Sequence, residues 1–250
     1  QATQIAAAKA RGARIIAVDP RAAGYARGAD HWLKLRPGSD LPLAMGLLRQ
    51  LIERRGYDEV FVRRWTNAAL LVRADSGAFL RAEDIGETGR TGAYVAWNGA
   101  PVFYDAGRRS FDVDAAGLSL RGRFVVAGIE CRPAFDHLCE AVQAYSPEHV
   151  ARMTGVAPEA QDKAAELLSA SRSVAYYCWT GVGQHRHATQ TDRAIALLVA
   201  LKGRHDAPGG NVAFTKVPTN PANGAELLTP EFTSRAIGYG ERPIGPAAMG

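Results

Sequence analysis

Three short segments combine acidic, amide and glycine residues in places where a ligand could be held. Val18-Asp19-Pro20-Arg21 follows an apolar run, Arg36-Pro37-Gly38-Ser39-Asp40 precedes a helical pattern, and residues 180–187 include two glycines, a glutamine and two histidines. Each segment lies between a predicted strand and a predicted helix. In open α/β sheets, such loops lie beyond the carboxyl ends of the strands, where ligands bind. The sequence therefore predicts a ligand site built from three loops.

The first two loops have residue types that suit a nucleotide. Asp19, at the end of a strand, can accept hydrogen bonds from ribose hydroxyls, although it could equally cap the next helix. Gly38 allows a ligand to approach the backbone closely. Ser39 and Asp40 offer acceptors for the N1–H and amino group of guanine. The alternative for this second loop is an ordinary turn with Asp40 as the N-cap.

The third loop has the features of a phosphate- or pterin-binding turn. Gly181 and Gly183 follow a predicted strand and precede a helix whose first backbone N–H groups are free to bind an anion. Gln184 could make paired hydrogen bonds. His185 and His187 could bind a metal, but no acid or cysteine lies at ligand spacing from them, so no metal site is predicted. No catalytic residue is assigned.

The composition is that of a globular protein. The 250 residues are 47% hydrophobic, which is enough for a sizeable core, and they contain no apolar run long enough to span a membrane. The net charge of +5 is scattered, so we expect neither a nucleic-acid partner nor a membrane contact from this segment. The odd number of cysteines argues against a disulfide framework. Buried free thiols are expected at Cys131, Cys139 and Cys178.

Alternating strand and helix patterns must position the loops. Continuous apolar runs predict strands over residues 14–18, 31–35 and 174–178. Helices are predicted over residues 2–11, 40–55, 59–65, 133–144, 158–169 and 188–201, with a further helix start at Ser146-Pro147-Glu148. Two hairpin turns, at residues 75–77 and 98–99, indicate a small antiparallel β insertion at about residues 67–130.

This order of elements predicts an α/β fold, with a doubly wound, mostly parallel sheet, helices on both faces and the small antiparallel β insertion. We expect a dinucleotide-type cofactor-binding domain over residues 1–205 and an extended linker toward another domain over residues 206–250. The opening Gln1-Ala2-Thr3-Gln4 is typical of the middle of a helix, and the first strand of such a sheet is missing. An internal piece of a longer chain is therefore expected.

Taken in order and spacing, these loops resemble those of the molybdopterin oxidoreductases, whose molybdenum is held by two molybdopterin guanine dinucleotides. The resemblance covers residues 1–66 and 140–212. The segments that carry it are Gly12 to Arg21, Ala29-Asp30, Leu35 to Asp40, Tyr57 to Val62, Tyr145 to Glu148, Thr154 to Val156 and Gly181 to Gly210. The resemblance implies that Asp19 contacts the ribose or guanine, that residues 38–40 hold the guanine, and that residues 183–185 lie near a pterin or the substrate.

The resemblance also implies a function for the parent protein. It would move two electrons at the molybdenum of bis(molybdopterin guanine dinucleotide), act on a small molecule and work with an electron-transfer subunit, with a [4Fe–4S] cluster in the part before this chain. Formate-dehydrogenase-like and acetylene-hydratase-like subgroups both fit, and so do the bacterial cytoplasm and periplasm. The predicted cofactor contacts are Asp19, Arg21, Gly38, Ser39, Asp40, Gly181, Gly183, Gln184 and His185.

Two other functions are open at this point. The middle domain of a thiamine-diphosphate enzyme also has a strand that ends in Asp-Pro and an Ala-Asp before the next strand, although the β insertion and the loop at residues 181–187 count against it. A non-enzymatic nucleotide-sensing module would need a complete domain with its first strand.

Overall fold

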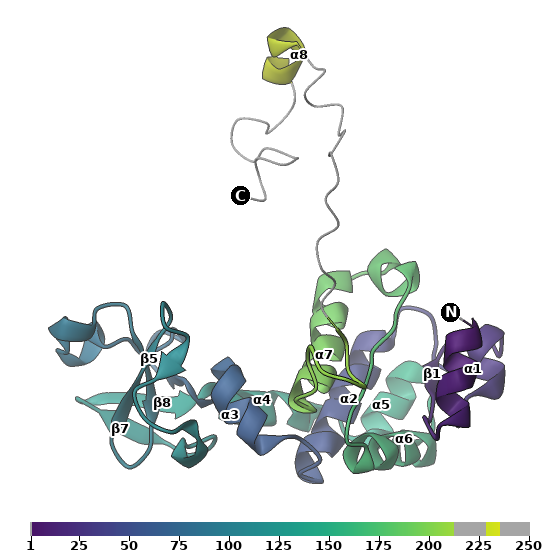
Figure 1. The fold of residues 1–250 in the computed structure, drawn as a ribbon, viewed down its shortest axis with the longest axis horizontal. Helices are drawn as coiled ribbons and strands as arrows, with labels where there is room; N and C mark the ends of the chain where they lie inside the picture. Colours follow the sequence, from purple (N-terminus) through teal and green to yellow (C-terminus); the bar gives the residue numbers. More distant parts are fainter. Residues whose placement is uncertain (1, 213–228, 236–250) are drawn as a thin grey trace. The chain divides into compact units, whose positions relative to one another are not determined.

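The computed structural model describes residues 2–212 and 229–235, and the chain divides into two compact units, residues 1–212 and 213–250 (Figure 1). The described part of the second unit contains helix α8 (Pro230–Arg235). Most of the predicted linker therefore lies outside the described residues, and the predicted domain boundary stays a prediction. No helix in residues 2–212 or 229–235 is long and apolar enough to cross a membrane.

The first unit begins with a helix and two parallel strands. In chain order these elements are α1 (Ala2–Ala10), β1 (Ile16–Val18), the 3-10 helix η1 (Gly24–Gly28) and β2 (His31–Leu33). Val18 pairs with Leu33 in parallel register, so both strands end at the same edge of the pair. The first two predicted loops begin at that edge, as expected for ligand-binding loops of an α/β sheet.

Asp30 fixes the start of the parallel pair. Its carboxylate accepts a hydrogen bond from the Ile15 backbone N–H at 2.7 Å and another from Arg14 Nε at 2.7 Å. The bond from Ile15, helped by the bond and charge of Arg14, holds the pKa of Asp30 below its ordinary value. The side chain thus ties the residues before β1 to the start of β2.

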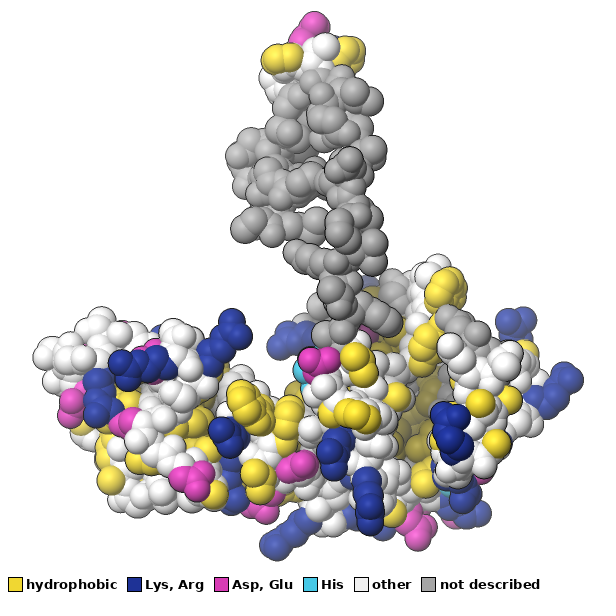
Figure 2. All heavy atoms as spheres, viewed as in Figure 1, with side chains coloured by type: hydrophobic (Ala, Val, Ile, Leu, Met, Phe, Trp, Pro, Cys, Tyr) yellow, Lys and Arg dark blue, Asp and Glu magenta, His cyan; other side chains and the backbone are white. Residues whose placement is uncertain are grey.

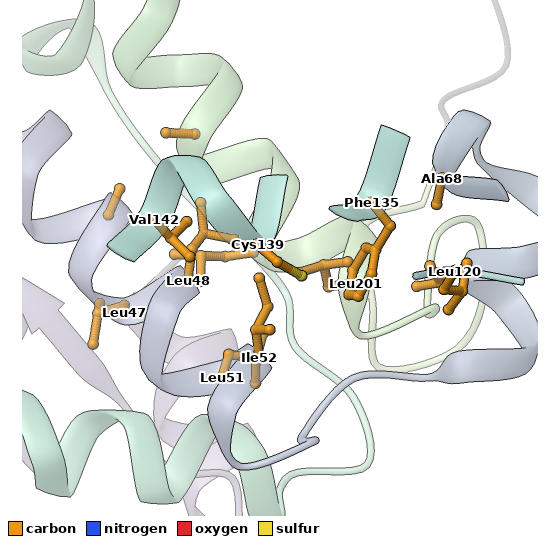
Figure 3. Close-up of a cluster of buried hydrophobic side chains, with 14 of the residues drawn as sticks. Leu47, Leu48, Leu51, Ile52, Ala68, Leu120, Phe135, Cys139, Val142 and Leu201 are labelled. Carbon is orange, nitrogen blue, oxygen red and sulfur yellow. The ribbon is translucent and has the colours of Figure 1, made fainter. Parts of the chain in front are cut away.

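Four helices contribute to the larger hydrophobic core, which also includes residues of α3 (Glu59–Trp65), α4 (Ala134–Ala141) and the stretch between them. The four helices are α2 (Asp40–Glu53), α5 (Pro147–Thr154), α6 (Pro158–Ala170) and α7 (Ala188–Leu201), and the other three all contact α2. Helix α2 buries Leu47, Leu48 and Leu51, which recur at helical spacing (Figure 3). Gly46 allows α5 to approach closely, because a Cβ atom there would lie 2.7 Å from Val150 Cγ2.

The predicted helix over residues 59–65 and the predicted helix start at Ser146 are confirmed. Asp58 Oδ1 accepts a hydrogen bond from Phe61 N–H at 2.9 Å, and Ser146 Oγ accepts one from His149 N–H at 3.2 Å. A capping oxygen satisfies an N–H group of the first turn, which has no partner within the helix. Between α2 and α5 the chain forms α3 (Glu59–Trp65), η2 (Asn67–Ala69), α4 (Ala134–Ala141) and η6 (Val142–Ala144).

The chain between α3 and α4 forms two antiparallel sheets, which confirms the predicted antiparallel character of this stretch. The first sheet has the order β3 (Leu71–Arg73), β8 (Ile129–Pro133), β7 (Phe124–Val126), and the second β4 (Tyr94–Trp97), β5 (Pro101–Asp105), β6 (Ser110–Phe111). Short 3-10 turns are η3 (Glu83–Ile85), η4 (Thr88–Arg90) and η5 (Ala115–Gly117). Both predicted hairpins are present. Trp97 stacks on Phe124 at 5.1 Å between ring centroids and closes a second, smaller core.

The predicted doubly wound sheet is not formed by residues 2–212. The parallel sheet in this part of the chain has two strands, β1 and β2, and the prediction of a third strand at residues 174–178 is wrong. An apolar run becomes a strand only where a neighbouring strand satisfies its backbone groups. Here the backbone N–H and carbonyl of Tyr176 are hydrogen-bonded to the side chain of Asn211 instead. The coarser description, helices combined with small sheets in an α/β arrangement, holds.

Two of the three cysteines are buried as predicted, and the third is not. Cys131 in β8 and Cys139 in α4 are buried, and burial raises the pKa of both thiols. Cys178 is exposed, so the expectation of burial is wrong for it. The reason is the missing strand, because the predicted strand was the element that would have buried its side chain.

Lys202, at the C-terminal end of α7, joins the ends of two other helices. Its buried Nζ donates hydrogen bonds to the carbonyl of Gly56 at 2.7 Å and to the carbonyl of Ser169 at 3.1 Å. The Ser169 carbonyl lies in the last turn of α6, where carbonyls lack helical partners and carry partial negative charge, and Gly56 follows the end of α2. Burial lowers the pKa of Lys202, and the charge of Asp58 opposes this effect.

Candidate functional site

The first predicted loop is a tight turn after β1. Asp19 Oδ1 accepts a hydrogen bond from Arg21 N–H at 2.7 Å, and the Asp19 carbonyl accepts one from Trp32 Nε1 at 2.8 Å. Asp19 therefore caps its own turn and not a helix, since η1 begins only at Gly24. The side chain of Arg21 is exposed and makes no ion pair with another described residue. Both side chains remain at the edge where β1 and β2 end.

The second loop has an internal hydrogen bond and one unpaired carboxylate. Ser39 Oγ donates to the carbonyl of Arg36 at 2.6 Å, and Gly38 has a φ of +80°, which glycine adopts at no cost. Ser39 occupies the N-cap position of α2, and Asp40 is the first helical residue, so the alternative of Asp40 as N-cap is wrong. Among residues 2–212, the half-buried Asp40 carboxylate has no hydrogen-bond or ion-pair partner.

Arg36 anchors this second loop to helix α5. Its Nη1 donates to the carbonyl of Arg152 at 2.7 Å, and its backbone N–H donates to the carbonyl of Thr154 at 2.8 Å. A cation at the C-terminal end of a helix also interacts favourably with the helix dipole. The side chain of Arg36 is thus a structural support for residues 37–40 and is not free to serve as a ligand contact.

The third loop contains a 3-10 turn, η7 (Thr180–Gln184), that leads into α7. Gly181 and Gly183 have open space where a Cβ atom would be, and neither has a positive φ. Their glycine character is therefore not required by the chain's own geometry and leaves the backbone open to a ligand. Gln184 and His185 are exposed. His187, the residue before α7, has a left-handed φ of +64°, which is uncommon for a non-glycine residue.

The second and third loops meet at Gly38 and His185. The Nδ1 atom of His185 lies 3.4 Å from the position that a Cβ atom on Gly38 would occupy. Two segments far apart in the sequence are therefore adjacent here, and Asp40 follows Gly38 by two residues in the chain. The first loop shares only the edge of the sheet with the second, through the parallel register of β1 and β2.

Tyr176 extends this surface inward and was missed as a site residue, because it lay within the predicted third strand. Its hydroxyl is buried and has no hydrogen-bond partner of good geometry among the described residues. Burial raises the pKa of Tyr176, and the neighbouring Cys178 thiol and the charges of Asp192 and Asp40 raise it further. The buried phenol lies on the segment that leads into η7.

The surface offers chemistry for binding, with acceptors at Asp40 and open backbone at the glycines of η7. In the described ranges, no group of three or more histidine, cysteine, aspartate or glutamate side chains could hold a metal ion. On the face drawn in Figure 2, the Lys and Arg side chains of the first unit are spread among polar and hydrophobic ones. The loops therefore combine hydrogen-bond acceptors with accessible backbone.

Comparison with known proteins identifies the family. No family model matches the chain. It is 30% identical over 213 residues to the alpha subunit of dimethylsulfide dehydrogenase from Rhodovulum sulfidophilum, a match that covers 81% of this chain and 23% of the relative. It is also 30% identical, over 277 residues, to a sulfite dehydrogenase subunit from Allochromatium vinosum, with 94% and 28% covered. The chain belongs to the molybdopterin oxidoreductase family.

This molybdopterin oxidoreductase chain spans about a quarter of the length of these curated relatives. Among solved structures, acetylene hydratase from Pelobacter acetylenicus matches 80% of the chain and 19% of its own length, with a TM-score of 0.50 and 21% identity. At this identity the likeness concerns the fold alone. Family membership favours the molybdopterin interpretation over the thiamine-diphosphate and nucleotide-sensor alternatives.

Proposed function

We propose that residues 1–205 are the part of a molybdopterin oxidoreductase that binds the guanine dinucleotide portion of its molybdenum cofactor. The observation that carries the proposal is the contact between His185 and Gly38, which makes one surface of two loops beside an unpaired carboxylate. The antiparallel stretch at about residues 67–130 is an insertion in this domain, and residues 206–250 are a linker toward another domain.

The residues on this surface fit a guanine nucleotide. The Asp40 carboxylate can accept hydrogen bonds from N1–H and the exocyclic amino group, which guanine presents side by side. Ser39 keeps an acceptor lone pair after its own hydroxyl proton is donated to Arg36. Gly181 and Gly183 leave room for a phosphate or a pterin to approach the backbone. Gln184 and His185 lie on the exposed side of the same turn.

The first loop would complete the nucleotide contacts. Asp19, at the end of β1, can accept hydrogen bonds from ribose hydroxyls with the carboxylate oxygen that does not bind Arg21 N–H. The exposed guanidinium of Arg21 can pair with a phosphate. In the whole protein, β1 and β2 would then be two strands of the larger doubly wound parallel sheet.

For the parent protein, we propose two-electron oxidoreductase activity on a small molecule. The cofactor, bis(molybdopterin guanine dinucleotide), supplies the redox-active molybdenum when bound, and this chain supplies the nucleotide contacts. Its relatives are themselves named as enzyme subunits, which supports assembly with an electron-transfer partner. A [4Fe–4S] cluster in another part of the protein belongs to the same proposal.

The proposal is tested by cofactor analysis of the protein purified from a molybdenum-replete host. Molybdenum is measured by elemental mass spectrometry, and guanine nucleotide is measured after acid release. Molybdenum together with about two guanine nucleotides per metal is the expected result. Thiamine diphosphate in place of both, or a nucleotide other than guanine, would contradict the proposal.

A further inference from the structure

The segment that leads to the third loop has an unusual support. Residues 172–179 belong to no strand, so their backbone groups need partners other than a β ladder. The partners come from the turn after α7. Arg204 Nε donates to the carbonyl of Arg172 at 3.3 Å, and Asn211 bonds the backbone of Tyr176.

Asn211 holds both backbone groups of Tyr176 at once. Its Oδ1 accepts the Tyr176 N–H at 2.6 Å, and its Nδ2 donates to the Tyr176 carbonyl at 2.7 Å. Two residues that exchange both such bonds form the repeating unit of an antiparallel sheet. One side-chain amide therefore replaces a neighbouring strand at this residue.

The turn that carries Asn211 is built to place it there. Gly209 has a φ of +83°, and a Cβ atom on it would lie 2.6 Å from Ser173 Oγ. Gly210 has no room for a side chain, because the carbonyl of Arg204 occupies that position. The Asn211 carbonyl also accepts a hydrogen bond from Asp206 N–H at 2.8 Å, which closes the turn. Residues 209 and 210 are thus glycines because Ser173 and Arg204 lie too close to them for a side chain.

The position of Tyr176 in turn affects the ligand loop. Four residues after it the chain enters η7, and its side chain ends in a buried hydroxyl. The backbone of Tyr176 is fixed by Asn211 through two hydrogen bonds. A shift of Tyr176 would move the loop relative to Gly38 and Asp40.

We propose that Asn211 is a positioning residue that fixes the third loop, residues 180–187, against the Asp40 loop for ligand binding. The expected effect of Asn211 on ligand affinity rests on the proposed guanine-nucleotide function. The expected effect of Asn211 on the position of the loop rests on the two hydrogen bonds alone.

The test compares the full chain with its Asn211→Ala variant, and uses Asn67→Ala as the matched control. Asn67 is an exposed asparagine in η2 with no side-chain hydrogen bond among the described residues. Amide hydrogen exchange is followed by mass spectrometry. With both hydrogen bonds lost, exchange in residues 176–187 should rise about 10- to 30-fold, while the rest of the chain and its melting temperature stay as in wild type. Asn67→Ala should change neither.

Affinity for guanosine diphosphate supplies the second measurement. Asn211→Ala should weaken binding at an unchanged melting temperature, a combination that a purely structural role would not produce. Asn211→Asp, which keeps the acceptor for the Tyr176 N–H and loses the donor, is the milder variant if the alanine variant does not fold.

Unchanged amide exchange in residues 176–187, or a rise spread evenly over the chain, overturns the positioning role. Failure of the wild type to bind the nucleotide overturns the proposed function and leaves the exchange test to decide on Asn211.

Discussion

The imidazole ring of His185 lies against Gly38, with Nδ1 3.4 Å from the position that a Cβ atom on residue 38 would take. The contact joins a loop after β2 to a loop before α7. The left-handed backbone at φ +80° favours glycine at residue 38. A Cβ atom there would touch the ring at van der Waals distance, so a larger side chain would have to displace it. Substitutions at Gly38 should therefore separate the two loops.

Gly38→Val is expected to weaken guanine-nucleotide binding by displacing His185. The matched control is Gly77→Val in the β insertion, where φ is +69° and the surrounding space is open. Both variants should lose about 1–2 kcal/mol of folding free energy because a side chain is forced into a left-handed conformation. Only Gly38→Val should lower the affinity, measured by calorimetry with guanosine diphosphate. An equal loss of affinity in both variants would show that the effect is not local to this contact.

Asp40→Ala is expected to weaken nucleotide binding without unfolding the chain. A charge-assisted hydrogen bond contributes about 1.5–3 kcal/mol, so the dissociation constant should rise on the order of 10-fold or more. Asp162→Ala is the control, because Asp162 is an exposed helical carboxylate that pairs with Arg54 on the surface. Surface ion pairs contribute little. Wild-type affinity in a folded Asp40→Ala variant would remove this carboxylate from the site.

Lys202→Met should destabilise the first unit. The substitution keeps a long side chain and leaves the partly buried carbonyls of Gly56 and Ser169 without their donor. A loss of about 1–3 kcal/mol in the free energy of unfolding is expected from the unsatisfied acceptors. Urea denaturation measures it, with the exposed Lys163→Met as the control. If the two variants are equally stable, the contact of Lys202 with the helix ends contributes nothing to stability.

Asp30 should make folding sensitive to acid. Its pKa in the folded chain lies below the ordinary value of 3.8, so the unfolded chain binds protons more readily as the pH falls. The stabilisation is fully present above the ordinary pKa and is lost as the pH falls through the lowered one. Asp30→Asn should cost about 1 kcal/mol at pH 7. The difference from wild type should shrink below about pH 4 in denaturation curves recorded over pH, and a constant difference would contradict this role of the carboxylate.

Elements whose signals are local could be predicted from the sequence. Helix α3 begins at the residue after Asp58 because the capping bond to Phe61 lies within one turn, and the bounds of α7 follow from its apolar spacing. The run at residues 174–178 carries the same kind of local signal for a strand. Its outcome depends on a partner far along the chain, and that partner is a side chain, Asn211. Local pattern contains no information on that choice.

In the candidate site too, local sequence signals could be predicted and contacts between distant segments could not. Glycines and acids after predicted strands indicated where a ligand could approach, and the structure places Gly38 beside His185. The structural role of Arg36 depends on the end of α5 and could not be seen from loop composition. The exposure of Cys178 and the buried hydroxyl of Tyr176 likewise depend on packing between distant segments.

The most direct test of the two-loop nucleotide site is photocrosslinking with 8-azidoguanosine diphosphate, followed by mass spectrometry of the labelled peptides. Label should appear in the peptides that contain residues 36–40 and 180–187, and unlabelled guanosine diphosphate should compete it away. Label confined to the antiparallel sheets of residues 71–133, or label that the unlabelled nucleotide does not displace, would contradict a nucleotide site at these two loops.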